Sequence, residues 1–215
     1  EDDLTWSNIK QNYTTHIYPN NTFSHSNNLV IDQQIDNLAQ ILMTSKKPII
    51  IAGNGSTDSY KNLRKLAKKS NIPVTTTLHG LGSIDEDDFY SLEWLGMHGS
   101  AATNYLIQEA DCILSLGSRF DDRTIGNKNL YAPEAFKAAH ENRGGIFQVE
   151  IDINQTKKTI NPTEIILGNC NYVINELLHK IKFKQRIQWF DQIIKLKSNV
   201  LSRKTEYPEN ALVEC

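Results

Sequence analysis

The sequence predicts an α/β protein built on a parallel sheet of five or six strands, with helices on both faces. Short apolar runs, many of them rich in β-branched residues, recur along the chain. Between them lie longer segments in which apolar residues recur three and four positions apart, as on one face of a helix. Strands that alternate with amphipathic helices indicate βαβ units, whose right-handed crossovers place helices on both faces of the sheet. The predicted architecture is therefore Rossmann-like.

The composition excludes several classes of protein. The chain has 215 residues, enough for one domain with extensions, and a formal net charge of −2, whereas nucleic-acid-binding proteins usually carry a basic patch. No apolar run approaches the roughly 20 residues of a membrane-spanning helix, so neither nucleic acid nor a membrane is an expected partner. The cysteines are far apart and odd in number, namely Cys112, Cys170 and Cys215. Neither disulfides nor a CxxC metal site is expected, and a reducing compartment is favoured.

Three parts are expected along the chain. Residues 1–28 lack hydrophobic periodicity and are rich in Asn, Thr and Ser, which indicates a linker or the tail of a preceding domain. Residues 29–183 are expected to form the nucleotide-binding α/β domain. Residues 184–215 are expected to form a C-terminal helix and a connecting strap. Because the first residue is Glu1 and no charged-then-apolar leader follows it, we expect a processed chain or a piece of a longer one.

The expected strands are apolar runs bounded by glycine, proline or charge. They cover residues 48–52, 71–78, 112–116, 144–151 and 164–168. Runs that are apolar at consecutive positions indicate strands buried on both faces, as in a parallel sheet.

The expected helices carry their apolar residues on one face. They cover residues 32–47, 58–70, 100–109, 132–136, 170–181 and 185–201. Asp58 or Ser59 is expected to cap the second of these helices, and Pro133 is expected to begin the fourth. The acidic run at 85–88 is expected to form a solvated turn.

Each expected strand ends in small or polar residues. These ends are Gly53-Asn54-Gly55, 77–80, Gly117-Ser118-Arg119, Glu150-Ile151 and Gly168-Asn169. Ligands of open α/β sheets bind at the carboxyl ends of the strands. Backbone N–H groups and arginines there can bind phosphate, carboxylates can bind ribose hydroxyls, and glycine lets the backbone approach a ligand closely. The pattern indicates a dinucleotide site.

The same residues allow other interpretations. Gly53-Asn54-Gly55 lacks the third glycine of GxGxxG, so the glycines could form tight turns without a ligand. His79 and His98 each lie beside a glycine with no carboxylate partner nearby in sequence, which favours ligand packing or hydrogen bonding over general-base catalysis. Asp121 and Asp122 could bind a metal, but the arginines at 119 and 123 favour an ion-paired cluster.

Four segments of the chain occur in a specific order: PVTTTLHGLG at 73–82, LGMHG at 95–99, LGSRFDDR at 116–123, and APEA through RGGI at 132–146. Together they closely resemble the central domain of acetohydroxyacid synthase, also called acetolactate synthase. This family is thiamine-diphosphate-dependent, and it joins pyruvate to a second 2-ketoacid in branched-chain amino acid biosynthesis. The likeness runs from about Lys47 to Phe190. The last segment looks most like the fungal mitochondrial forms, which implies a mitochondrial location.

The resemblance implies a FAD-binding middle domain set between two thiamine-diphosphate-binding domains. The implied FAD contacts are Gly53, Asn54, Gly55, Thr77, Leu78, His79, Leu95, Gly96, Met97, His98, Gly117, Arg119, Asp121, Arg123, Thr124, Glu150, Ile151 and Asn169. In the family, the equivalents of Met97 and Arg123 also border the channel to the thiamine site, where herbicides bind. FAD is expected to be structural because the overall reaction is not a redox one, so no catalytic residue is expected in this chain.

The chain also departs from the family pattern. Asn169 stands where the family usually has an aspartate, Asn54 replaces a small residue, and Ser118 varies. The GDG…N thiamine-diphosphate motif, which ligates magnesium, does not occur in the chain. Thiamine diphosphate and Mg²⁺ are therefore expected in the full-length enzyme only. The implied partners are the remaining domains of the same enzyme, further copies of it, and a regulatory subunit.

Two alternatives remain at this point. The domain could have lost the flavin and serve only in folding or oligomer contacts, as the departure at Asn169 suggests. It could also belong to a flavin-free thiamine-dependent 2-ketoacid decarboxylase, although the RFDDR run at 119–123 argues against that.

Overall fold

The computed structural model describes residues 25–205 of the chain, and the side chains of residues 29–199. Its centre is a single sheet in which all five pairs of neighbouring strands are parallel. The six strands are β1 (Pro48–Ala52), β2 (Val74–Thr76), β3 (Ser91–Trp94), β4 (Cys112–Leu116), β5 (Gly145–Glu150) and β6 (Glu164–Leu167). The strand order is β3-β2-β1-β4-β5-β6. The predicted α/β class with a parallel sheet is confirmed.

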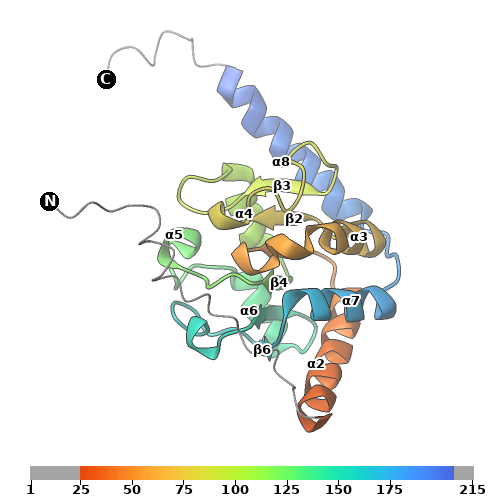
Figure 1. Ribbon diagram of the computed structural model, residues 1–215. Helices are drawn as coiled ribbons and strands as arrows, with labels where there is room; N and C mark the ends of the chain where they lie inside the picture. The colour runs from red at the N-terminus through yellow and green to blue at the C-terminus, as the bar shows by residue number, and fades with distance from the viewer. Residues whose placement is uncertain (1–24, 206–215) are drawn as a thin grey trace, which may run out of the picture.

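Helices cover the sheet on both sides (Figure 1). The α-helices are α2 (His25–Thr44), α3 (Tyr60–Ser70), α4 (Ala101–Glu109), α5 (Asp122–Ile125), α6 (Pro133–His140), α7 (Cys170–Lys180) and α8 (Ile187–Thr205). Short 3₁₀ helices follow three of the strands: η1 (Asn54–Ser59), η2 (Leu78–Gly80) and η3 (Ile153–Gln155). None of the helices within residues 25–205 combines the length and apolarity that crossing a membrane requires.

Two hydrophobic cores lie on the two faces of the sheet. One is formed with α2, α3 and α7, and the other with α4, α6 and α8. Successive side chains of a strand point to opposite faces, so Ile50 packs in the first core while Ile49 and Ile51 pack in the second. Each of these isoleucines is fully buried, which contributes about 1.5–3 kcal/mol per side chain. Burial on both faces explains why β1 has no apolar–polar alternation.

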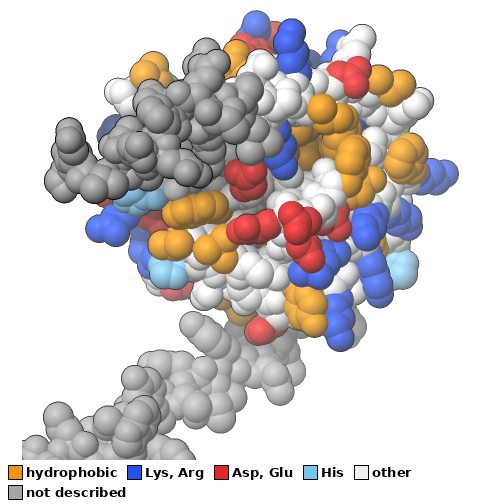
Figure 2. Space-filling view, turned by 90° about the horizontal axis from the view of Figure 1, so that it is seen from above, with side chains coloured by type: hydrophobic (Ala, Val, Ile, Leu, Met, Phe, Trp, Pro, Cys, Tyr) orange, Lys and Arg blue, Asp and Glu red, His pale blue; other side chains and the backbone are white. Residues whose placement is uncertain are grey.

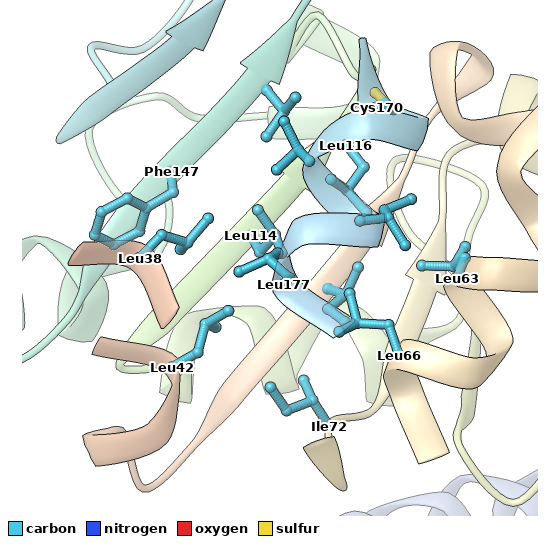
Figure 3. Packing of buried hydrophobic residues seen from close by; sticks show 14 of the residues in the cluster. Leu38, Leu42, Leu63, Leu66, Ile72, Leu114, Leu116, Phe147, Cys170 and Leu177 are labelled. Carbon is cyan, nitrogen blue, oxygen red and sulfur yellow. The ribbon is translucent and has the colours of Figure 1, made fainter. Parts of the chain in front are cut away.

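The first core draws on three helices of distant sequence. Figure 3 shows Leu38 and Leu42 of α2 and Leu177 of α7 directed toward Leu114 of β4, with Leu63 and Leu66 of α3 at the other side of the cluster. Cys170 and Cys112 belong to the same core and are free thiols. Burial raises the pKa of both thiols to about 12, so they pack as small apolar side chains.

The second core includes the C-terminal helix. Trp189, Phe190 and Ile193 of α8 are buried in it, and the indole N–H of Trp189 donates to the carbonyl oxygen of Pro48 at 3.2 Å. The helix is thus packed against the sheet and not merely appended to the domain. The expected division into 1–28, 29–183 and 184–215 stays a prediction. Residues 1–24 and 206–215 lie outside the described part, and the helix expected from Asp32 already begins at His25.

A buried arginine fixes the segment that leads into α8. Arg186 is 4% exposed, and its guanidinium donates to the carbonyl oxygens of Leu42 and Ser70 at 2.6 Å each. These carbonyls belong to the last turns of α2 and α3, where backbone oxygens have no helical partner and the helix dipole favours a cation. Burial lowers the pKa of Arg186 to about 10, against the opposing effect of Asp111.

Several local predictions were wrong. The strand Ser91–Trp94 was not expected, because only Leu92 and Trp94 in it are apolar and Glu93 has a φ of 64°. The strand expected at 71–78 is reduced to Val74–Thr76, since Asn71 takes the left-handed conformation that ends α3. The helix expected from Asp58 begins at Tyr60, and neither proposed cap forms a capping hydrogen bond.

The face of the molecule seen from above mixes acidic, basic and hydrophobic side chains (Figure 2). No continuous basic area is visible on this face. Such mixing accords with the nearly balanced numbers of basic and acidic residues, 23 and 25.

Candidate functional site

The strand order places a topological switch point between β1 and β4. The chain builds the sheet outward from β1 through β2 to β3, then returns and builds outward from β4 through β5 to β6. Ligands of doubly wound sheets bind outside the carboxyl ends of the strands at such a point. The carboxyl ends of β1 and β4 therefore mark where a ligand site is expected on physical grounds alone.

A cleft of about 720 Å³ opens at this point, within the range of ordinary ligand sites. Its lining includes nine of the eighteen expected FAD contacts: Asn54, Gly55, Thr77, His79, Gly117, Arg119, Asp121, Glu150 and Ile151. The remaining lining residues are Thr57, Asp58, Ser118, Asp152 and Gln155. Sequence reasoning assigned none of these five to the site: it singled out Asp58 as a possible helix cap and Ser118 as a departure from the family. Thr57, Asp58, Asp152 and Gln155 could have been found from the sequence, because each of them lies a few residues after a strand-end motif.

Three glycines bring the two turns at the switch point into contact. A Cβ on Gly53 would lie 2.2 Å from the carbonyl oxygen of Gly117, and a Cβ on Gly117 would lie 2.4 Å from the Cα of Gly55. Gly117 also has a φ of +61°, and its carbonyl oxygen accepts from the N–H of Gly55 at 3.1 Å. The space that a side chain would need is thus taken by the neighbouring turn. These glycines are explained by the packing of the turns, whether or not a ligand approaches them.

Arg119 is exposed at the edge of the cleft, whereas the next residue points inward. Phe120 is 2% exposed and has a φ of 52°, a backbone conformation that only a minority of non-glycine residues adopt. This turn of the backbone separates the charged side chain from the buried ring.

The expected ion-paired cluster at 119–123 does not form. Among the described residues, neither Arg119 nor Arg123 lies within 4.0 Å of a carboxylate oxygen. Asp121 instead caps α5, because its Oδ1 accepts from the N–H of Thr124 at 2.9 Å. Arg119 is therefore left with its guanidinium directed to solvent and open to an anionic ligand.

Glu150 lies at the end of β5 and is 7% exposed. Burial raises the pKa of its carboxyl group, while the N–H groups of Ile151 and Asp152 and the charge of Arg119 act in the opposite direction. Its Oε1 accepts from the N–H of Ile151 at 3.0 Å. A buried carboxylate is suited to accept hydrogen bonds from ligand hydroxyl groups, because such bonds offset part of the free energy lost when the charge is removed from water.

A second, smaller hollow of about 170 Å³ lies beside the cleft-forming loops. Five further expected FAD contacts line it, namely Leu95, Gly96, Met97, Arg123 and Thr124. Its walls also include Asn104, Ile107, Gln108, Ile125, Gly126 and Tyr131. The N–H of Met97 donates to the carbonyl oxygen of Arg123 at 2.9 Å, which joins the loop after β3 to α5. The side chain of Met97 is 67% exposed.

Four expected contacts line neither hollow: Gly53, Leu78, His98 and Asn169. Leu78 is 55% exposed in η2. Asn169 caps α7, because its Oδ1 accepts from the N–H of Asn171 at 2.8 Å.

Two other features of the described residues bear on the chemistry. A polar hollow of about 300 Å³ lies between α2 and the amino ends of β5 and β6, so no carboxyl end of a strand opens into it. Within residues 25–205, no group of three or more His, Cys, Asp or Glu side chains is arranged to hold a metal ion.

Comparison with known proteins agrees with this geometry. Residues 35–177 match the sequence family described as "Thiamine pyrophosphate enzyme, central domain". The mitochondrial acetolactate synthase catalytic subunit of Saccharomyces cerevisiae is 38% identical over 193 residues, which are 88% of this chain and 27% of that protein. The mitochondrial acetolactate synthase of Schizosaccharomyces pombe is 43% identical over 169 residues, 76% of this chain and 25% of that protein.

A bacterial relative shows the same partial coverage. The acetolactate synthase isozyme 1 large subunit of Escherichia coli is 32% identical over 165 residues, 77% of this chain and 28% of that protein. The chain spans about a quarter of the length of the curated relatives it matches. The resemblance to acetolactate synthase catalytic subunits, including fungal mitochondrial ones, is confirmed. Since the family match covers more than half of its residues, the chain belongs to the thiamine pyrophosphate enzyme central-domain family.

Proposed function

We propose that the chain is the FAD-binding central domain of an acetohydroxyacid synthase catalytic subunit. The complete enzyme would use thiamine diphosphate to decarboxylate pyruvate and add the product to a second 2-ketoacid, giving 2-acetolactate from two pyruvates. The FAD assignment rests on one observation. The cleft at the switch point is lined by nine of the eighteen residues expected to contact FAD. The reaction is proposed for the complete enzyme, because this chain spans only about a quarter of its relatives.

The residues of the cleft fit a diphosphate-linked nucleotide. Arg119 is exposed in the lining and has no carboxylate partner within the described part of the chain, so it would bind the diphosphate through charge-assisted hydrogen bonds. Glu150 is buried at a strand end and would accept hydrogen bonds from ribose hydroxyls. Leu95 to His98 and Arg123 would border the flavin side of the site. FAD supplies no redox step to the overall conversion, and we propose that its role is structural.

One proposed contact has less support. The Oδ1 of Asn169 is already used as the cap of α7, which leaves only its Nδ2 for a ligand. The family usually has an aspartate here, whose second oxygen would stay free as an acceptor. The adenosine side of the proposed site is therefore expected to lack one acceptor in this protein.

The proposal also covers other cofactors, partners and location. Thiamine diphosphate and Mg²⁺ would be held by other domains of the same enzyme, since the GDG…N motif does not occur in this chain. Relatives named "catalytic subunit" and "large subunit" support a homo-oligomer that works with a regulatory subunit. The word "mitochondrial" in the names of the fungal relatives supports a mitochondrial location.

The test is made on the full-length protein. We expect purified protein to release FAD on denaturation, to bind FAD again in a titration, and to form 2-acetolactate from pyruvate with thiamine diphosphate, Mg²⁺ and FAD present. Protein that releases and binds no flavin would favour the alternative of a domain that has lost the cofactor. Flavin-independent release of acetaldehyde as the main product would favour a 2-ketoacid decarboxylase.

The assignment of Arg119 has its own test. The substitution Arg119→Ala is expected to weaken FAD binding by about 1.5–3 kcal/mol, or about 10- to 150-fold, because a charge-assisted hydrogen bond is lost. Arg143→Ala is the matched control, since Arg143 pairs with Glu141 outside the cleft. Equal affinities in the two variants would remove Arg119 from the proposed site.

A further inference from the structure

The side chain of Asn104 binds both backbone groups of one residue. Its Oδ1 accepts from the N–H of Gly96 at 2.9 Å, and its Nδ2 donates to the carbonyl oxygen of Gly96 at 2.8 Å. Asn104 lies in the first turn of α4, and Gly96 lies eight residues earlier, just after β3. A half-buried amide thus satisfies a peptide donor and a peptide acceptor at once.

The N–H of Gly96 needs such a partner because regular structure does not supply one, whereas its carbonyl oxygen also accepts from the N–H of Gly99 at 2.9 Å. Gly96 is buried, and it lies in the loop Leu95–Gly99 between β3 and α4. Buried backbone N–H and C=O groups are costly when they have no partner. Its φ of +113° favours glycine, and a Cβ there would lie 2.9 Å from the carbonyl oxygen of Arg123. No other residue type fits this position without strain.

The loop is therefore held from two sides. Asn104 ties Gly96 to α4, and the bond from the N–H of Met97 to the carbonyl oxygen of Arg123 ties the next residue to α5. Next to these two attachments the loop presents Met97 and His98 to solvent, with the apolar side chain of Met97 67% exposed. The fixed backbone gives the exposed side chain of Met97 a defined position in the lining of the second hollow.

We propose that Asn104 is a positioning residue, which fixes the loop Leu95–Gly99 so that Met97 and His98 face the bound flavin. This inference rests on the proposed function, because Met97 and His98 are proposed FAD contacts. Asn104 acts through the backbone of Gly96, since both ends of its amide are engaged there. Loss of the amide would remove the attachment of the loop to α4, while the bond from Met97 to α5 remains, and would so loosen the flavin side of the site.

Two substitutions separate the two hydrogen bonds. Asn104→Leu has nearly the same size and removes both bonds. Asn104→Asp keeps an acceptor for the N–H of Gly96 but places a carboxylate oxygen against its carbonyl oxygen. The matched control is Asn62→Leu, because Asn62 is also half-buried and its amide donates to Asn171 and Asn175, away from both hollows.

The experiment uses the full-length protein and measures three quantities. Hydrogen exchange of the peptide that covers 95–99 is followed without FAD, FAD affinity by titration, and the visible absorption and fluorescence of bound flavin at saturation. For Asn104→Leu we expect exchange at least about tenfold faster and FAD affinity at least about tenfold lower. We also expect an altered flavin spectrum, and a melting temperature close to that of Asn62→Leu. Asn104→Asp is expected to fall between Asn104→Leu and the unchanged protein.

The outcomes are distinguishable. Unchanged exchange and affinity in Asn104→Leu would overturn the inference, and so would equal losses of affinity in Asn104→Leu and Asn62→Leu. If Asn104→Leu does not fold, Asn104→Asp decides by the same measurements. If the unchanged protein binds no FAD, the proposed function fails, and the exchange of 95–99 still shows whether Asn104 orders the loop.

Discussion

Gln148 holds Ser118 in place from inside the sheet: its Nε2 donates to the carbonyl oxygen of Ser118 at 2.9 Å. Gln148 is fully buried in β5, and Ser118 lies in the turn after β4 that carries Arg119. Among the residues that the structure describes, the Oε1 of Gln148 has no partner, and neither does the Oγ of Ser115, its neighbour in register on β4. A buried amide with one unpaired end lowers the stability of the fold. We therefore expect its remaining bond, to Ser118, to position the turn that carries Arg119.

Gln148→Leu is expected to weaken FAD binding about three- to tenfold, because the turn that carries Arg119 loses a hydrogen bond of about 0.5–1.5 kcal/mol. The free energy of unfolding should change by less than about 1 kcal/mol, since the unpaired Oε1 is removed together with the bond. FAD titration and chemical denaturation of the full-length protein measure the two effects. Ser115→Ala is the control, as it removes a buried unpaired group without touching the turn. A loss of stability with no loss of affinity would contradict the prediction.

Gly117→Ala is expected to destabilise the protein by about 2–5 kcal/mol. The left-handed conformation costs about 1–2 kcal/mol for alanine, and the clash with the Cα of Gly55 adds about 1–3 kcal/mol. Gly82→Ala provides the comparison, because Gly82 has a φ of +88° but no atom within 4 Å of the added Cβ. Only the conformational cost should appear there. Denaturation curves that coincide for the two variants would show that the turns can separate.

Arg186→Met is expected to destabilise the protein by about 2–4 kcal/mol, because the buried carbonyls of Leu42 and Ser70 lose their donors. Part of the loss is offset by no longer burying a charge. Arg64→Met is the matched control, since Arg64 also donates to two backbone carbonyls, those of Gly82 and Ser83, but is only half-buried. Its loss should cost less than about 1 kcal/mol. Thermal unfolding that is equal in both variants would contradict this account.

Glu150→Gln is expected to make the protein more stable at neutral pH and to weaken FAD binding. Burial raises the pKa of Glu150 above its ordinary value of 4.5, so the folded state holds the proton more tightly than the unfolded chain. Ionisation therefore costs stability as the pH rises from 4.5 through the raised pKa, and the glutamine removes this cost. The advantage of the variant should disappear below about pH 4.5, where the carboxyl is protonated in both states. Unfolding measured across this window, without FAD, checks the sign.

Much of the fold could be predicted because it depends on local patterns. The run at 49–52 is short and apolar at every position, which favours a strand buried on both faces. The edge strand Ser91–Trp94 has no such pattern, since only two of its four residues are fully buried and only two are apolar. Its place beside β2 is set by pairing with a strand already in the sheet, which local sequence does not report.

The candidate site could be located from the sequence, but its internal contacts could not. Glycine and charge after a strand indicate an edge of the sheet, and the cleft lies there. That Asp121 would cap α5 and leave Arg119 free depends on how the backbone turns at Phe120. The paired bonds of Asn104 depend on the crossing of α4 over the loop, and the burial of Arg186 depends on three helices meeting. Each is a tertiary relationship between residues that no short motif connects.

The bonds of Lys184, Arg186 and Trp189 limit where the chain could be shortened. The Nζ of Lys184 donates to the carbonyl oxygens of Thr44 and Ser45, so the turn between α2 and β1 is fastened to the segment that leads into α8. The segment before α8 thus belongs to the folded unit itself. A chain cut before residue 184 would leave the carbonyl oxygens of Leu42, Ser70 and Pro48 without these donors.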